Sequence, residues 1–142
     1  MKKLVAAALC SMTLLAACGG SSNTPSSTGS AAFCNNVKAI GSLSKGTADA
    51  MAMKPADSKK DFEALAAKIT ALKASAPSGL RVAIETVAAR FTLQSTLESM
   101  MAADPKGGAD ETKMLADHKT ADDAAIATLI ATAKTSCKVD LS

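Results

Sequence analysis

The sequence predicts an all-α protein, an up-down-up-down four-helix bundle closed by a disulfide bond. Three observations lead to this fold class. The chain has no Trp or Tyr and only three Phe, and its apolar residues are mainly Ala, Leu, Val, Ile and Met, which favours closely packed helices over strands. Apolar residues recur at helical spacing in four segments, which are separated by Pro or Gly. Two cysteines stand at the outer ends of the first and last segments.

An apolar leader precedes the predicted bundle. Met1-Lys2-Lys3 is a short positive region, and residues 4–17 carry no charge. This run is shorter than the roughly 17–25 residues that a membrane-spanning helix needs. Small residues stand directly before Cys18. Together these features have the three-part layout of a secretory signal.

The residues that close this leader, Leu15-Ala16-Ala17-Cys18, resemble the lipobox of bacterial lipoprotein precursors. The resemblance implies cleavage before Cys18 and a diacylglyceryl thioether on its sulfur, with acyl chains such as palmitate, and N-acylation can follow. Two or more acyl chains give stable anchoring, at about 0.8 kcal/mol per buried CH2. We therefore expect a lipid-anchored protein at the extracytoplasmic face of a bacterial membrane, either the cell membrane or an outer membrane if one exists. The alternative is an ordinary cleaved signal with an incidental cysteine.

Three regions follow from this interpretation. Residues 1–17 form a signal peptide, residues 18–30 contain the lipidated Cys18 and a flexible Gly/Ser/Thr tether, and residues 31–142 form the helical bundle domain. The tether has no apolar residue that could seed a core. Its expected r.m.s. span is about 20 Å, which keeps the folded part close to the membrane.

The first predicted helix covers residues 31–45. Gly41 and Gly46 weaken its end, and residues 47–54 either continue it or form a short separate turn that Pro55 stops. Its apolar residues recur at i, i+4 and i+7 and share one face: Phe33, Val37 and Ile40.

The second and third predicted helices carry the clearest apolar stripes. The second begins at Asp57 or Ser58, where Ser58 and Asp61 form an approximate capping box. A Pro–Gly turn at residues 76–79 separates it from the third, which covers residues 80–102. The stripes are Phe62, Leu65, Ala66, Ile69 and Leu72 in the second helix, and Leu80, Ile84, Val87 and Phe91 in the third, with a rotated set of Leu93, Leu97 and Met100.

The fourth predicted helix follows the breakers at residues 104–108 and runs from Asp110 to about Cys137. Acidic residues at its start complement the helix dipole. Asp122 and Asp123 are interpreted as part of its solvated face. Its expected core residues are Leu115, Ile126, Leu129, Ile130 and Ala133.

The cysteines leave one pair for the folded domain. Cys10 departs with the leader and lipid occupies Cys18, so Cys34 and Cys137 remain in a compartment where disulfides persist. In an up-down-up-down bundle both lie at the same pole, where their Cα atoms can approach within the roughly 7 Å that a disulfide requires. We expect them to pair. The alternatives are two separate thiols or an intermolecular bridge.

Composition and motifs exclude several function classes. Without Lys2 and Lys3 the chain has 14 basic and 13 acidic residues, so it has no basic surface for nucleic acid. Ser42-Leu43-Ser44-Lys45 has the S-x-x-K spacing of penicillin-recognising serine enzymes, but the partner motifs S-D-N and K-T-G are missing. We therefore expect a non-enzymatic protein without a cofactor.

Five methionines outside the leader surround the first-to-second and third-to-fourth helix connections. The predicted topology places both connections at the membrane-distal pole. Three interpretations are possible: the methionines fill irregular space at helix ends, they form an adaptable patch for an envelope protein or a small apolar ligand, or some of them bind Cu(I). The five residues are Met51, Met53, Met100, Met101 and Met114.

The Cu(I) interpretation depends on His118, which follows Met114 at i, i+4 and shares its helix face. Met100 and Met101 would supply further thioether ligands. A binding or interaction module remains the leading expectation, and a carrier of a small apolar ligand or Cu(I) is the alternative. A cavity lined by Phe91, Met100, Met101 and Met114 would favour the carrier.

Overall fold

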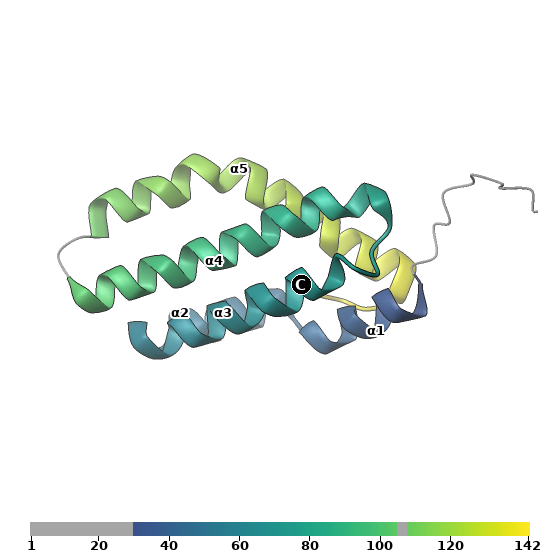
Figure 1. The fold of residues 1–142 in the computed structure, drawn as a ribbon, viewed down its shortest axis with the longest axis horizontal. Helices are drawn as coiled ribbons and strands as arrows, with labels where there is room; N and C mark the ends of the chain where they lie inside the picture. Colours follow the sequence, from purple (N-terminus) through teal and green to yellow (C-terminus); the bar gives the residue numbers. More distant parts are fainter. Residues whose placement is uncertain (1–29, 105–107) are drawn as a thin grey trace, which may run out of the picture.

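The computed structural model describes residues 30–104 and 108–142, and every regular element in them is helical (Figure 1). The predicted all-α class and the helical bundle are confirmed. The α-helices are α1 (Ala31–Ile40), α2 (Leu43–Met51), α3 (Pro55–Leu72), α4 (Arg81–Ala103) and α5 (Gly108–Thr132). A 3-10 turn, Ser78–Leu80, leads into α4, and a π-helical turn, Ala133–Cys137, follows α5.

Several predicted features lie outside the described residues. These are the leader, the lipidated Cys18, the tether as far as residue 29, and residues 105–107 of the turn between α4 and α5. Ser30, which we assigned to the tether, is described and caps α1, because its Oγ accepts a hydrogen bond from the Phe33 N–H at 3.1 Å.

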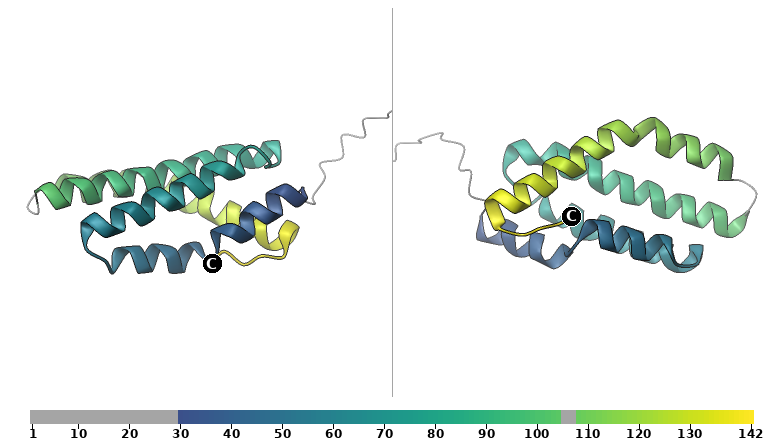
Figure 2. Two further views of the ribbon diagram at one scale, coloured as in Figure 1. Left: turned by 60° about the horizontal axis from the view of Figure 1, so that its bottom comes forward. Right: turned by 180° about the vertical axis from the view of Figure 1, so that it is seen from behind.

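The central pair of the bundle is formed by α3 and α4, which run antiparallel along most of their length (Figures 1 and 2). The rings of Phe62 and Phe91 stack across this pair with their centroids 6.2 Å apart. The two main predicted stripes are confirmed, because each of their residues is buried: Phe62, Leu65, Ala66, Ile69, Leu72, Leu80, Ile84, Val87 and Phe91.

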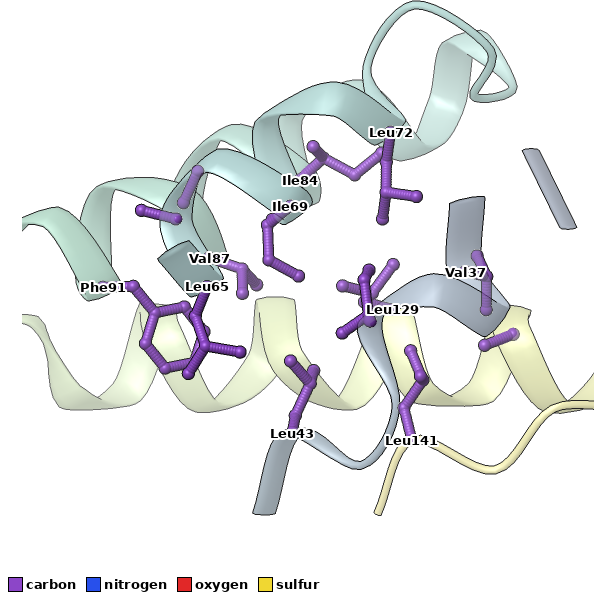
Figure 3. Close-up of a cluster of buried hydrophobic side chains, with 14 of the residues drawn as sticks. Val37, Leu43, Leu65, Ile69, Leu72, Ile84, Val87, Phe91, Leu129 and Leu141 are labelled. Atoms are coloured by element: carbon purple, nitrogen blue, oxygen red, sulfur yellow. The ribbon is translucent and has the colours of Figure 1, made fainter. Parts of the chain in front are cut away.

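The other helices pack around this pair. The long helix α5 runs back along α4, whereas α2 packs on α3, and α1 packs on both α3 and the π-helical turn. Figure 3 shows side chains from all these elements meeting in one core, among them Val37, Leu43, Ile84 and Leu129. In α5 the prediction is only partly right: Leu129 and Ala133 are buried, and the half-buried residues are Leu115, Ile126 and Ile130.

The predicted end of the first helix, near residue 45, is wrong. The helix stops at Ile40, and Gly41 follows with a φ of 75°, a left-handed conformation that glycine adopts without a steric penalty. Ser42 then caps a new helix, α2, through a hydrogen bond from the Lys45 N–H to its Oγ at 3.1 Å. Gly46, which we took as a weak point near a helix end, lies inside α2.

The predicted start of the second long helix is also wrong. α3 begins at Pro55, which occupies its first turn, where the missing N–H of proline costs no hydrogen bond. Ser58 is therefore one turn inside the helix, only 1% exposed, and its hydroxyl donates to the Pro55 carbonyl at 3.2 Å. The capping box with Asp61 does not form.

The chain after the π-helical turn folds back to the break between α1 and α2 (Figure 2). Lys138 turns it with a φ of 57°, and Leu141 is fully buried. The Leu43 N–H donates to the Leu141 carbonyl at 2.8 Å, and the Ser42 hydroxyl donates to the Ser142 carbonyl at 2.8 Å. The first of these bonds occupies the Leu43 N–H, a donor in the first turn of α2 that has no partner within the helix.

Asp140 orders the end of this returning segment. Its carboxylate accepts hydrogen bonds from the Ser142 hydroxyl at 2.6 Å and the Ser142 N–H at 3.0 Å. Both bonds hold the pKa of the Asp140 carboxyl below its ordinary value, with the hydroxyl contributing most.

Candidate functional site

One end of the bundle carries the five methionines that the sequence singled out. α2 ends there and α3 begins there, and α4 ends close to the start of α5 (Figure 1). We call this the methionine end and define it by Met51, Met53, Met100, Met101 and Met114.

Most of these methionines are on the surface. The exposed fractions are 66% for Met51, 47% for Met53, 49% for Met100 and 47% for Met114, whereas Met101 is half-buried. The first interpretation, that methionine fills space between helix ends, therefore fits the half-buried Met101 better than these four residues. Exposed methionine is flexible and polarizable, and it suits surfaces that adapt to an apolar partner.

The opposite end is closed by the disulfide bond. Cys34 and Cys137 are joined, with their Cα atoms 5.1 Å apart, so the predicted pairing is confirmed. Ser30 lies at this end, because its carbonyl accepts a hydrogen bond from the Cys34 N–H at 3.0 Å and its hydroxyl donates to the Ser75 carbonyl at 3.2 Å. We call this the disulfide end and define it by Ser30, Cys34, Ser75 and Cys137.

Of the candidate metal ligands, the methionines lie at the methionine end, whereas His118 lines a pocket. Met114 and His118 are both exposed and lie one turn apart on α5. His118 also lines a pocket between α4 and α5, and the pocket lining includes none of the methionines. Among the side chains that the structure describes, those of residues 30–104 and 113–142, no group of three or more His, Cys, Asp or Glu is arranged to hold a metal ion.

The pocket between α4 and α5 has a volume of about 460 Å³, within the range of small-molecule sites. It does not match the cavity that would have favoured a carrier with a methionine-lined interior, because Phe91 is buried in the core and the methionines lie elsewhere. The lining residues are Thr86, Ala89, Arg90, Leu93, His118, Ala121 and Asp122.

Asp122 corrects the interpretation of the acidic pair in α5. Asp123 lies on the solvated face and pairs with Lys119, as expected of an exposed helix residue. Asp122 is instead 5% exposed, and its Oδ2 accepts a hydrogen bond from Arg90 Nη1 at 3.1 Å. The signal was available in the sequence, because Asp122 stands at helical spacing before the buried Ala125 and Leu129.

The S-x-x-K residues have structural roles. Ser42 caps α2 and contacts the Ser142 carbonyl, and Lys45 pairs with Asp49 one turn along α2. The Ser42 hydroxyl therefore both donates and accepts a hydrogen bond within the fold.

Comparison with known proteins adds no relative. No protein-family model, curated protein or solved structure is significantly similar to the chain. Among the helices that the structure describes, none has both the length and the apolar character needed to cross a membrane.

Proposed function

We propose that this chain is a lipid-anchored, non-enzymatic lipoprotein of the bacterial envelope that binds another envelope protein through its methionine end. The observation that carries the proposal is the exposure of Met51, Met53, Met100 and Met114 at one end of the bundle. Exposed apolar side chains that gather in one region of a protein surface are typical of interaction sites. The proposed partner contributes an apolar surface, against which the flexible methionines repack.

The proposed lipid attachment places the methionine end on the side of the bundle that faces away from the membrane. The lipobox resemblance assigns the anchor to Cys18, which precedes Ser30 at the disulfide end by 12 positions. The methionine end then points away from the membrane. A bundle of the up-down-up-down type, with α1 and α2 as two halves of its first arm, is the arrangement that we infer from the paired cysteines and the antiparallel long helices.

The anchor is tested by Cys18→Ser with Cys10→Ser as the matched control, because both cysteines lie in or at the leader. We expect the Cys18→Ser chain to leave detergent-dependent membrane fractions and Cys10→Ser to stay in them. Metabolic labelling with a palmitate analogue should mark Cys10→Ser and not Cys18→Ser. Retention and labelling of the Cys18→Ser chain would refute the lipid assignment.

The partner site is tested by placing a photo-crosslinking amino acid at position 51 and, as the control, at position 82. Val82 is 72% exposed and stands in the first turn of α4, toward the disulfide end. We expect a discrete cross-linked protein from position 51 in intact cells, and its yield should fall when Met53, Met100 and Met114 are changed to Gln. Equal cross-linking from both positions, or none from position 51, would contradict the proposal.

A Cu(I) carrier is the second candidate, and the exposure of Met114 and His118 one turn apart is the observation that favours it. Competition with a chromophoric Cu(I) chelator distinguishes the two candidates. A carrier requires tight Cu(I) binding that Met114→Leu with His118→Gln abolishes. Unchanged affinity in this double variant would remove the metal site.

A further inference from the structure

A hollow between α4 and α5 arises where two alanines face it. Ala89 on α4 and Ala121 on α5 both line the pocket, and their single methyl groups leave its space of about 460 Å³ unfilled. Both alanines are exposed, so the hollow opens to solvent. Leu93, half-buried, adds an apolar wall. The pocket is therefore accessible to a small molecule with an apolar part.

Arg90 gives this pocket a fixed cationic group. Its side chain is 26% exposed, and the carboxylate of the buried Asp122 holds it, because Arg90 Nη1 donates a hydrogen bond to Asp122 Oδ2 at 3.1 Å. A guanidinium has five N–H donors, so most of them remain for another acceptor. A partly desolvated arginine held in place by a carboxylate is well suited to bind a second carboxylate, because its donors form a planar fork.

The neighbouring charges do not compete for this position. On the same stretch of α5, Lys113 pairs with Asp117 and Lys119 pairs with Asp123. His118 lines the pocket with its imidazole and can donate one further hydrogen bond to an anion. Asp122 offsets the charge of Arg90, so a carboxylate would be held mainly by directional hydrogen bonds from the guanidinium and the imidazole. Repulsion from Asp122 grows with each further negative charge on the ligand, which favours a monoanion over a polyanion.

We infer that the pocket between α4 and α5 binds a small organic monocarboxylate. Arg90 and His118 receive the carboxylate, Asp122 positions Arg90, and Leu93 with the two alanines contacts the apolar part of the ligand. None of the methionines lines this site, so it does not depend on the proposed protein-binding function, although its His118 is also the candidate Cu(I) ligand.

The test uses two probes of the same shape, 4-fluorobenzoate and its neutral analogue 4-fluorobenzamide, with the full chain and fluorine NMR detection. We expect saturable binding of 4-fluorobenzoate with a Kd of about 1 mM or below. The benzamide should bind about tenfold more weakly, because it lacks the charge that Arg90 recognises. Absence of saturable benzoate binding up to about 10 mM, or equal binding of both probes, would overturn the proposal.

Three variants and one control connect binding to this pocket. Ala121→Leu fills the hollow and should abolish binding of 4-fluorobenzoate, whereas Ala127→Leu, at an exposed position of α5 outside the pocket, should leave the Kd unchanged. Arg90→Lys keeps the charge but loses the planar fork, so the Kd should rise about tenfold. Ala89→Leu fills the pocket from α4 and provides a second blocking test if Ala121→Leu alters the fold. Retained affinity in a folded blocking variant, or in Arg90→Lys, would refute the site.

Discussion

The two ends of the bundle differ in what holds them. At the disulfide end, segments far apart in sequence are joined: Cys34 is bonded to Cys137, and Ser30 contacts Ser75. At the methionine end, local hydrogen bonds hold the helix ends, from the Met53 N–H to the Ala50 carbonyl at 3.1 Å and from the Asp104 N–H to the Met100 carbonyl at 2.8 Å.

This difference predicts where substitutions will affect stability. At the disulfide end, the Cys34–Cys137 bond restricts the unfolded chain and holds α1 against the turn that follows α5. The other end carries exposed apolar side chains whose replacement leaves no cavity. Substitutions should therefore have large effects on stability at the disulfide end and small ones at the methionine end.

The largest effect is expected when the disulfide is removed. The double variant Cys34→Ser, Cys137→Ser should lose about 2–5 kcal/mol of unfolding free energy, because the bond closes a loop with a sequence separation of 103. Urea denaturation of the oxidised chain and the variant measures this loss. The reduced wild-type chain is the matched control and should unfold like the variant. A loss below about 1 kcal/mol would contradict the assigned role.

The next largest effect concerns the returning C-terminal segment. Leu141→Ala should cost about 2–3 kcal/mol, because this fully buried side chain fills space beside the break between α1 and α2. Val139→Ala, at a half-buried position on the same segment, is the control and should cost less. If thermal or urea unfolding gives equal losses for the two variants, the segment does not anchor the core in this way.

A smaller effect is expected at the start of α2. Ser42→Ala should cost about 1 kcal/mol, because it removes the helix cap and the contact with the Ser142 carbonyl. Ser44→Ala, at an exposed position inside α2, should be neutral or slightly stabilising, since alanine has the higher helix propensity. A Ser42→Ala chain as stable as Ser44→Ala would show that the cap contributes nothing.

The smallest effect is expected at the methionine end. Met51→Gln with Met53→Gln should change the unfolding free energy by no more than about 0.5 kcal/mol, because both side chains are largely exposed. Leu97→Gln is the contrasting variant, since Leu97 is 2% exposed and its replacement buries an amide. A methionine variant that loses as much stability as Leu97→Gln would mean that these residues are packed.

The long helices could be predicted from the sequence because local pattern and burial agree there. In α3 and α4 the apolar stripes continue over several turns, and each turn supports the next. Asp122 could also have been recognised, because it continues the stripe of Ala125, Leu129 and Ala133, all of them buried. We assigned Asp122 to the solvated face because charged side chains, and adjacent aspartates in particular, are usually exposed.

The helix break and the returning segment could not be predicted in the same way. Gly41 is compatible with a weak helix end or with a sharp break, and the choice depends on Leu141, which fills the core beside it. Val139 and Leu141 are too few to show a helical or strand period. The pocket likewise depends on how far apart α4 and α5 lie at Ala89 and Ala121, which no local pattern determines.

The position of the disulfide has a mechanical consequence. Cys34 lies in the first turn of α1, and Cys137 ends the π-helical turn after α5. If the chain is held from its N-terminal side and a partner pulls on the opposite end, the tension reaches Cys34 and divides there. One covalent path runs through α1 and α2, and the other crosses the sulfur bridge into α5. The pulling force is then divided between two segments of the chain, so neither segment bears the full force before the helices separate.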